Sequence, residues 1–286
     1  MFVESVIFAE NPDAALAPVP RVFLYALRRK GWSMPRFFVD PSAISGDTVT
    51  LTGDNAHHAS FSLRLAPGDR IKVCDQQIAY LCEMVAFTAD TATARILSAS
   101  PIDTEPPFAA HLYQALPKGD KLDTVIQKAV ECGVSRVTPF ESSRCIVRAK
   151  PEAEGRKTER RTRIAEEAAK QCGRGILPTV TPTVTYAEAL KMAAGSDLIL
   201  FCYEGEGTVP LPVIIEQAHP RLEAARQEGR TPVIAIFVGS EGGFSPDEAG
   251  AAADMGAAMT GLGKRILRTE TASGFVLSCL IYALEL

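Results

Sequence analysis

The sequence has few of the residues that metal sites and disulfide frameworks need. It contains four histidines, and its seven cysteines include no C-x-x-C pair. Dispersed, unpaired thiols are typical of a reducing compartment, where cysteines act as small apolar fillers. His57 and His58 are adjacent, but neither Cys74 nor Cys82 completes a zinc-ligand spacing with them. We therefore expect a packing or turn role for both histidines, and no bound metal.

Long apolar runs are also absent. No stretch approaches the ~20 residues needed to cross a bilayer, and a content of 47% hydrophobic and 22% charged residues is ordinary for a globular protein. We expect a cytoplasmic protein with no membrane partner, and 286 residues are enough for two domains. Residues 1–33 mix alanine, proline and arginine without sustained periodicity, and their acidic residues argue against a transit peptide. We expect this extension to be poorly ordered and dispensable.

The net charge of −4 does not indicate binding of nucleic acid. The distribution of charge is more informative, because ten basic and five acidic residues lie between Arg144 and Arg174. Such a run is commonly the solvated face of a helix. Contact with phosphate groups is the alternative.

The spacing of apolar residues divides the chain into two regions. Residues 34–102 are predicted to form a small β-barrel with strands at 36–39, 48–51, 70–74, 78–87 and 91–97, and with helical periodicity only near 56–65. A linker with three prolines between Pro101 and Pro107 follows. Strands at 111–115, 137–140, 198–202 and 232–238, together with a helical stripe from Leu122 to Val130, predict an α/β domain with a parallel sheet over 108–286.

The most informative segments are two glycine loops near the carboxyl end. The apolar run 232–238 leads into VGSEGGFSPDE, where Gly239, Gly242 and Gly243 break the strand. Ser245 and Glu248 then form the capping box of a helix. Because glycine has no Cβ and tolerates positive φ, backbone N–H groups in such a turn can approach a ligand closely.

The second loop, GLGKRILRTET, follows a short predicted strand at 257–260 and leads into an apolar helix. Arg265, Arg268 and Glu270 lie at the mouth of that helix. Its apolar positions on the 3.6-residue period are Ala272, Phe275, Val276, Cys279, Leu280 and Ala283. The two loops are predicted to form two walls of one pocket, and the lack of G-x-G-x-x-G and of a lysine-bearing phosphate loop argues against either familiar nucleotide fold.

The pair GSEGG and LGKRILRTET resembles the signature of the SPOUT class of RNA methyltransferases, in particular the ribosomal RNA small-subunit methyltransferase E family. The usual forms in that family are GPEGG and LGxRILRxET, so Ser240 stands where the family has proline, which changes loop stiffness more than chemistry. Further matching segments are MPRFFV from Met34, NAHHASFSLRLAPGDRIKVCD from Asn55, LPKGDKLDTVIQKAVECGVSRVTPFESSRC from Leu116 and EEAAKQCGR from Glu166. The resemblance covers nearly the whole chain after Met34.

The resemblance implies a PUA-like RNA-binding β-barrel at 34–102 and a SPOUT α/β domain at 108–286 with a deep trefoil knot, the chain after Gly261 passing through the preceding loop. It also implies a homodimer formed through the knotted domain. The implied cofactor is S-adenosylmethionine (SAM). The residues that the resemblance places at the cofactor are Cys202, Tyr203, Gly239, Ser240, Glu241, Gly242, Leu262, Gly263, Ile266 and Leu267.

The implied reaction is methylation of a uridine N3 in small-subunit (16S) ribosomal RNA, with the assembled subunit as the expected partner. Arg268 is the expected stabiliser of the uridinate charge, and Glu270 either accepts the imide proton or is an ordinary helix-terminal carboxylate. The candidate RNA contacts are Arg36, Arg64, Lys118, Lys121, Arg144, Arg160, Arg161 and Arg174. Two other functions stay open: methylation of another RNA such as transfer RNA, and RNA binding without catalysis in ribosome assembly.

Overall fold

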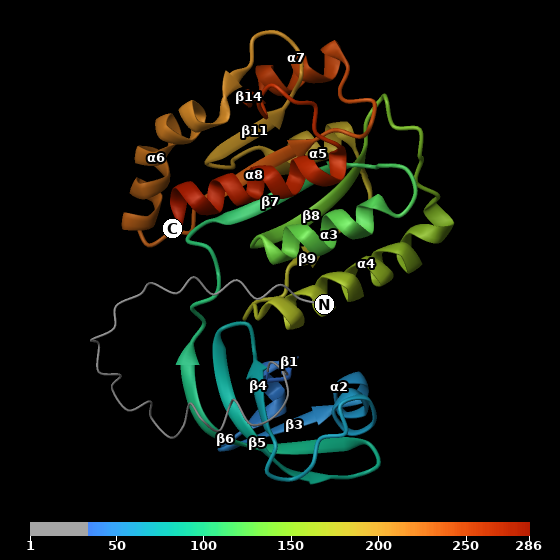
Figure 1. Ribbon diagram of the computed structural model, residues 1–286, viewed down its shortest axis with the longest axis vertical. Coiled ribbons are helices and arrows are strands. Elements are labelled where there is room, and N and C mark those ends of the chain that lie inside the picture. The colour runs from blue at the N-terminus through green and yellow to red at the C-terminus, as the bar shows by residue number, and fades with distance from the viewer. Residues whose placement is uncertain (1–33) are drawn as a thin grey trace, which may run out of the picture. The chain divides into compact units, whose positions relative to one another are not determined.

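The computed structural model describes residues 34–286 (Figure 1). The predicted extension at residues 1–33 lies outside the described residues. That it is poorly ordered and dispensable stays a prediction. Within residues 34–286, no helix combines the length and the apolar character needed to cross a membrane.

The first sheet is mixed and has six strands in the spatial order β1-β4-β5-β6-β3-β2. The strands are β1 (Arg36–Phe38), β2 (Ile44–Ser45), β3 (Thr48–Thr52), β4 (Arg70–Cys74), β5 (Ile78–Phe87) and β6 (Thr91–Pro101). Only the pair β1 and β4 is parallel among them. Two short helical segments, α2 (Gly53–His57) and the π-helical η2 (His58–Ser62), lie where the sequence predicted helical periodicity, and η1 (Pro41–Ala43) precedes β2.

The alternation of apolar residues correctly predicted β1, β3, β4, β5 and β6, because one face of the sheet covers a small core of its own. The two-residue β2 was not predicted. That core includes Phe37, Val49, Leu51 and Ile71, which are fully buried. One boundary was wrong: β6 was predicted to end at residue 97, but it continues to Pro101, which pairs with Ile78. The start of the predicted linker is therefore strand.

The second sheet is entirely parallel, with the order β10-β8-β7-β13-β11-β14-β12 and β9 beside β8. Its strands are β7 (Ala109–Ala115), β8 (Val134–Glu141), β9 (Thr179–Val180), β10 (Val184–Thr185), β11 (Leu198–Cys202), β12 (Val209–Pro210), β13 (Val233–Val238) and β14 (Ala258–Gly261). The strands predicted at 198–202 and 232–238 are β11 and β13. They lie side by side with all carboxyl ends at one edge, which is where ligands bind in open α/β sheets.

Five helices connect the strands of this sheet: α3 (Lys121–Glu131), α4 (Pro151–Cys172), α5 (Tyr186–Ala193), α6 (Leu211–Gln227) and α7 (Pro246–Asp254). A sixth, α8 (Thr269–Leu284), follows the last strand. α8 lies beside α3, which in turn lies beside α4 (Figure 1). Val276, Leu277 and Leu280 of α8 are fully buried. Phe275 and Ala283, which the periodicity assigned to the apolar stripe, are exposed instead, because the buried face of α8 is rotated toward Leu277 and Leu284.

Aromatic rings beneath the carboxyl edge of the sheet fix the first glycine loop. Phe244, directly after the loop, is buried and lies with its ring centroid 4.2 Å from that of Phe201 and 6.2 Å from that of Phe140. Phe237 of β13 stacks on Tyr113 of β7 at 4.6 Å. The loop is thus held at both ends by large rings in the core.

Candidate cofactor and catalytic site

A cavity of about 910 Å³ opens at the carboxyl ends of β11, β13 and β14. This volume is at the upper end of the range of small-molecule sites, which is ~300–1,000 Å³. Its lining includes all ten residues predicted to bind the cofactor: Cys202, Tyr203, Gly239, Ser240, Glu241, Gly242, Leu262, Gly263, Ile266 and Leu267. The structure therefore brings together three loops whose residues lie as far apart in the sequence as Cys202 and Leu267.

The first glycine loop is compact because its backbone packs against itself. A Cβ on Gly239 would come within 3.1 Å of the Gly243 Cα, and a Cβ on Gly242 within 3.1 Å of the Arg144 carbonyl oxygen. Gly243 has φ +63°, a conformation that glycine adopts without the steric cost of a side chain. The predicted capping box is present, with Ser245 Oγ accepting from the Glu248 N–H.

A buried glutamine joins the loop to the start of α8. Gln114 Nε2 donates to the Thr269 hydroxyl at 2.9 Å and to the Gly239 carbonyl at 3.3 Å. The Thr269 hydroxyl in turn donates to the Gly239 carbonyl at 2.6 Å. The sequence did not predict a role for Gln114 or Thr269, since no local pattern marks a contact between residues 155 positions apart.

The second glycine loop forms the opposite wall. Gly263 has φ +102°, and a Cβ built there would have no atom of residues 34–286 within 4 Å. Leu262 and Leu267 are half-buried and pack against the core. Ile266 also borders the cavity, but it is 84% exposed, so its side chain gives far less apolar shielding than the two leucines.

The loop after β11 completes the lining. The Tyr203 ring lies against Gly205, where a Cβ would come within 2.1 Å of its Cε1 atom. Burial raises the pKa of the Cys202 thiol to about 12. Cys202 is therefore a neutral, poorly nucleophilic thiol at physiological pH.

Three charged side chains meet at the rim of the cavity. Lys121 Nζ lies 2.7 Å from the Glu241 Oε1 atom and 3.8 Å from the Glu270 Oε2 atom. Partial burial works to raise the pKa of Glu241, but hydrogen bonds from Lys121 and from the Lys118 N–H outweigh it and hold that pKa below its usual range. Lys121 is thus engaged by carboxylates rather than free for phosphate.

The two predicted catalytic residues differ in accessibility. Arg268 borders the cavity and is exposed, and its guanidinium has no hydrogen bond or ion pair within residues 34–286. Glu270 lies in the first turn of α8 outside the cavity lining. Its Oε2 atom is buried and has no hydrogen-bond donor among the described residues. Lys121, at 3.8 Å, is close enough for an ion pair but beyond hydrogen-bond distance.

The predicted RNA contacts fall into two groups. Arg64, Lys118, Arg144 and Arg160 are exposed, and Arg144 also borders the cavity. Arg161 and Arg174 were wrong as RNA contacts, because they are 6% and 4% exposed. Arg36 is partly buried, and its guanidinium donates to the Arg174 carbonyl at 2.6 Å, so it too is occupied within the protein.

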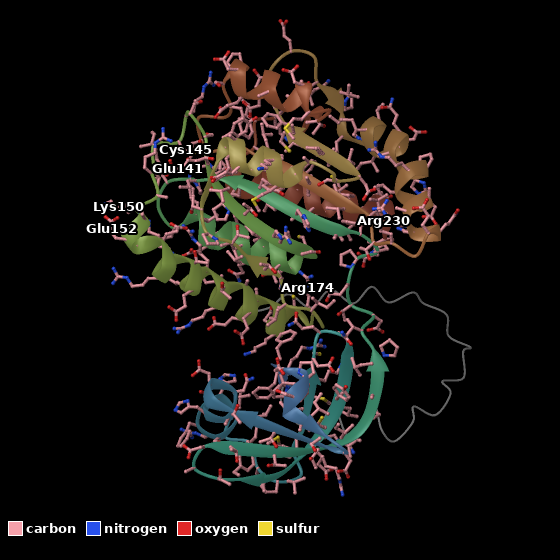
Figure 2. All side chains as sticks on the ribbon, turned by 180° about the vertical axis from the view of Figure 1, so that it is seen from behind. Glu141, Cys145, Lys150, Glu152, Arg174 and Arg230 are labelled. Carbon is pink, nitrogen blue, oxygen red and sulfur yellow. The ribbon has the colours of Figure 1, made fainter. Side chains whose placement is uncertain are left out.

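The buried arginines each neutralise a carboxylate. Arg174 lies just past the end of α4 (Figure 2). It is paired with Glu105 and donates to the Val134 carbonyl. Arg161 donates to Glu154 at 3.0 Å and to the Thr183 hydroxyl at 3.3 Å. Sequence periodicity could not separate these residues from their exposed neighbours, because charge alone does not report burial.

Charge reversal on α4 should distinguish the two kinds of arginine. Arg161→Glu should destabilise the fold by about 3–5 kcal/mol, because it leaves Glu154 buried beside a second carboxylate. Arg160, whose side chain is 56% exposed beside Asp123, should tolerate Arg160→Glu. If Arg160 contacts phosphate, this variant should weaken RNA binding and lower the slope of log K against log salt concentration by about one unit.

Urea unfolding and RNA titrations at several salt concentrations would test both effects, with Lys191→Glu on α5 as the control for an equal change in charge. If the salt dependence of RNA binding is the same for Arg160→Glu as for the wild type, the exposed face of α4 contacts solvent and not RNA.

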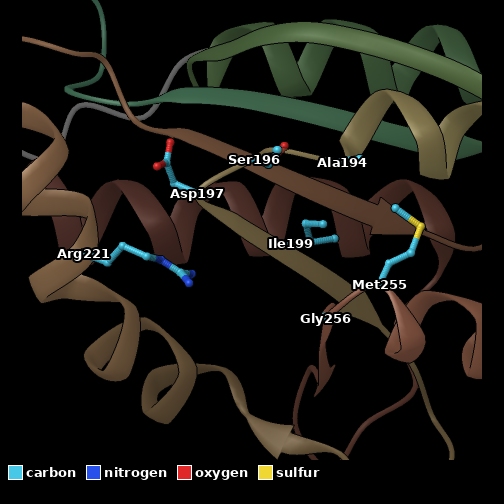
Figure 3. Close-up of a pocket in the computed structure, with 8 residues that line it drawn as sticks. Ala194, Ser196, Asp197, Ile199, Arg221, Met255 and Gly256 are labelled. Carbon is cyan, nitrogen blue, oxygen red and sulfur yellow. The ribbon is translucent and has the colours of Figure 1, made fainter.

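A second, smaller cavity of about 300 Å³ lies near the amino end of β11 (Figure 3). It is lined in part by Asp197, Arg221 and Met255. The Asp197 carboxylate is already held by two hydrogen bonds from Arg230, at 2.7 and 2.8 Å. No predicted site residue lines this cavity. In the part of the chain that the structure describes, no group of three or more His, Cys, Asp or Glu side chains is placed to hold a metal ion.

Comparison with known proteins agrees with this architecture. A family model described as RNA methyltransferase domain matches residues 104–281, and one described as RNA methyltransferase PUA domain matches residues 51–97. The fold and the cavity at the carboxyl edge thus define an RNA methyltransferase with a PUA-like domain.

Individual relatives narrow the class. The chain is 30% identical over 260 residues to ribosomal RNA small subunit methyltransferase E of Bacillus subtilis, covering 88% of this chain and 98% of that protein. The crystal structure of the enzyme of that name from Neisseria gonorrhoeae, bound to S-adenosyl methionine, is 30% identical with a TM-score of 0.72 and covers 87% of this chain and 98% of its own. A methyltransferase from Legionella pneumophila, in complex with SAM, is 26% identical with a TM-score of 0.74, over 88% of this chain and 98% of its own. The chain belongs to the ribosomal RNA small subunit methyltransferase E family, which confirms the resemblance identified from its motifs.

Proposed function

We propose that this protein uses SAM to methylate a uridine N3 in the 16S RNA of the small ribosomal subunit. The observation that carries the proposal is the cavity of about 910 Å³ formed by the two signature loops and the loop after β11. Its walls suit SAM, because Ser240 Oγ is buried without a hydrogen-bond partner among the described residues, and the glycines at 243 and 263 leave open space where a Cβ would stand. A bound ligand would supply the missing partner and fill that space.

Residues of the three loops would hold the cofactor. Backbone groups of Gly239, Leu262 and Leu267 would contact its adenine and ribose, and the two leucine side chains would add apolar walls. When bound, SAM supplies a methyl group on a sulfonium, which is already a good leaving group. The protein must then position the nucleophile in line, an effect worth about 7–11 kcal/mol.

Uridine N3 is a poor nucleophile until its imide proton is lost. Arg268 is suited to stabilise the developing charge on O2 or O4, because its guanidinium borders the cavity and no carboxylate of residues 34–286 is paired with it. Glu270 is suited to receive the proton. Its buried Oε2 accepts no hydrogen bond from residues 34–286, and the ammonium of Lys121 lies 3.8 Å away. Since Glu270 does not line the cavity, transfer through a water molecule fits better than direct transfer.

The expected homodimer has support on the surface of α8. Phe275, Cys279 and Tyr282 follow one another at spacings of four and three residues, which places them on one face of the helix, and Leu286 follows just beyond its end. Tyr282 is 78% exposed, and Phe275 and Leu286 are also exposed. An exposed apolar stripe of this kind is typical of a protein–protein contact.

Light scattering should therefore give twice the 30.7 kDa chain mass at micromolar concentration. The double variant Phe275→Glu with Tyr282→Glu should be monomeric, because it places charges in an apolar contact. Met192→Glu, at an exposed apolar position on α5, is the control and should stay dimeric. A monomeric wild-type protein would contradict the proposed dimer.

The trefoil knot is part of the same proposal. β14 pairs with the side of β11 that faces away from β13, and the chain then returns through residues 262–268 to begin α8 beside Gly239. On its way it passes the segment after β11, since a Cβ on Gly261 would lie 3.4 Å from the Thr208 hydroxyl. This return path supports threading of the C-terminal segment through the preceding loop.

Labelled methyl transfer tests the proposal directly. Purified small subunits, naked small-subunit RNA and transfer RNA would be incubated with the protein and methyl-labelled SAM, and the product would be mapped by nuclease digestion. We expect label at one uridine in assembled subunits, as for an enzyme acting in the cytoplasm on ribosomes. Label in transfer RNA alone would identify another substrate, and SAM binding without any label would favour an assembly factor that does not catalyse.

A further inference from the structure

An aromatic ring stands in solvent on the domain built around the first sheet. Phe61, in η2, is 65% exposed, whereas Phe37 in the same domain is fully buried. The Phe61 ring is stacked on the imidazole of His57, with centroids 4.8 Å apart and an interplanar angle of 27°. His57 is exposed as well. Ser62, which follows Phe61, is polar and exposed, so the pair of rings does not belong to a larger apolar patch.

The helical turn that carries this pair is firmly attached to the sheet. Ala56 and Ala59 face the core and are buried. The His58 ring meets the edge of Phe37 at 6.1 Å, and Asn55 Nδ2 donates to the Phe38 carbonyl at 2.8 Å. Both histidines are exposed, but the His58 ring keeps an edge contact with the core through Phe37. His57 is turned outward on a rigid base.

A cation follows on the same segment in an uncommon backbone conformation. Arg64 has φ +52°, which is rare for residues other than glycine and persists only where the surroundings impose it. Here Leu63 and Leu65 impose it, because both pack against the core and the Leu65 N–H donates to the Ala59 carbonyl at 3.0 Å. Arg64 itself is exposed, and within residues 34–286 its guanidinium has no hydrogen-bond or ion-pair partner.

We infer that His57 and Phe61 form a stacking platform for an unpaired base of the RNA, with Arg64 contacting the adjoining phosphate. The inference rests on the proposed function and names a binding site within it. Two exposed stacked rings, followed three residues later by an exposed arginine with no partner among residues 34–286, match single-stranded RNA, whose bases offer a π-face and whose backbone is anionic. A protein partner fits less well, since one ring pair among polar residues offers little of the apolar core that protein interfaces need.

Binding of short RNAs tests the platform. Fluorescence anisotropy would be measured with a labelled single-stranded oligoribonucleotide and with the blunt duplex of the same sequence. Phe61→Ala should weaken single-strand binding about tenfold, and Phe61→Trp should restore it, because stacking on one aromatic side chain is worth roughly that much. Duplex binding should change less than about twofold, because paired bases do not expose their faces. Arg64→Gln should lower the salt slope by about one unit.

The matched control is Val85→Ala, which removes an exposed apolar side chain from β5 of the same sheet. It should leave RNA binding unchanged, and SAM affinity and the thermal midpoint should be unchanged in all variants. Equal single-strand affinity of wild type and Phe61→Ala would overturn the platform. A change in molecular mass on Phe61→Ala, seen by light scattering, would also overturn it by identifying a protein contact. Failure of the wild type to bind any RNA would instead contradict the proposed function.

Discussion

Arg268→Ala is expected to lower the rate of methyl transfer about 100-fold or more, the usual effect of removing one pre-organised group that stabilises developing charge. Its affinity for SAM should stay close to that of the wild type. The backbone role of Arg268 survives the change, because it is the carbonyl of this residue that accepts the N–H groups of Thr271 and Ala272 at the start of α8. Only the guanidinium at the cavity is lost.

Raising the pH should partly rescue Arg268→Ala, because more of the uridine is then already deprotonated and less charge stabilisation is needed. The control is Arg265→Ala, which removes an exposed arginine from the same loop and should cost much less rate. Single-turnover methylation gives the rate, and calorimetry gives the SAM affinity. Loss of SAM binding in Arg268→Ala, or a wild-type rate, would show that this arginine does not stabilise the uridinate.

The sequence predicted the parts of this site that are encoded locally. The run ending at Val238, the glycines after it and the pair Ser245 and Glu248 each specify strand, turn and helix within a few residues, and the structure has all three. The mutual approach of the loops followed from the parallel sheet and from the family resemblance. Local coding is why these predictions succeeded.

The features that the sequence did not predict depend on contacts between distant segments. Gln114 reaches Gly239 across 125 positions, and Arg174 finds Glu105 across 69. No periodicity reports such partners, so a buried arginine and an exposed one look alike in a basic run. The rotation of α8 that exposes Phe275 has the same origin, since packing against α3 and the sheet, not helical period, selects the buried face.

Gly263→Val is expected to abolish useful binding of SAM, with a loss of affinity of about 30-fold or more, equivalent to about 2 kcal/mol. No atom of residues 34–286 would lie within 4 Å of a Cβ at this position. The side chain would instead project into open space of the cavity that the cofactor needs. In addition, φ +102° is strained for a β-branched residue, so the loop itself should shift.

A second glycine with a similar backbone conformation separates loss of cofactor space from backbone strain. Gly229 has φ +75°, has no atom within 4 Å of its missing Cβ, and does not line the cavity. Gly229→Val should therefore carry a similar backbone strain of about 1–2 kcal/mol while SAM still binds normally. Calorimetric titration with SAM and thermal unfolding of both variants make the comparison. If both lose stability equally and Gly263→Val still binds SAM within about threefold of wild type, Gly263 serves only the turn, and the cofactor does not occupy the space beside it.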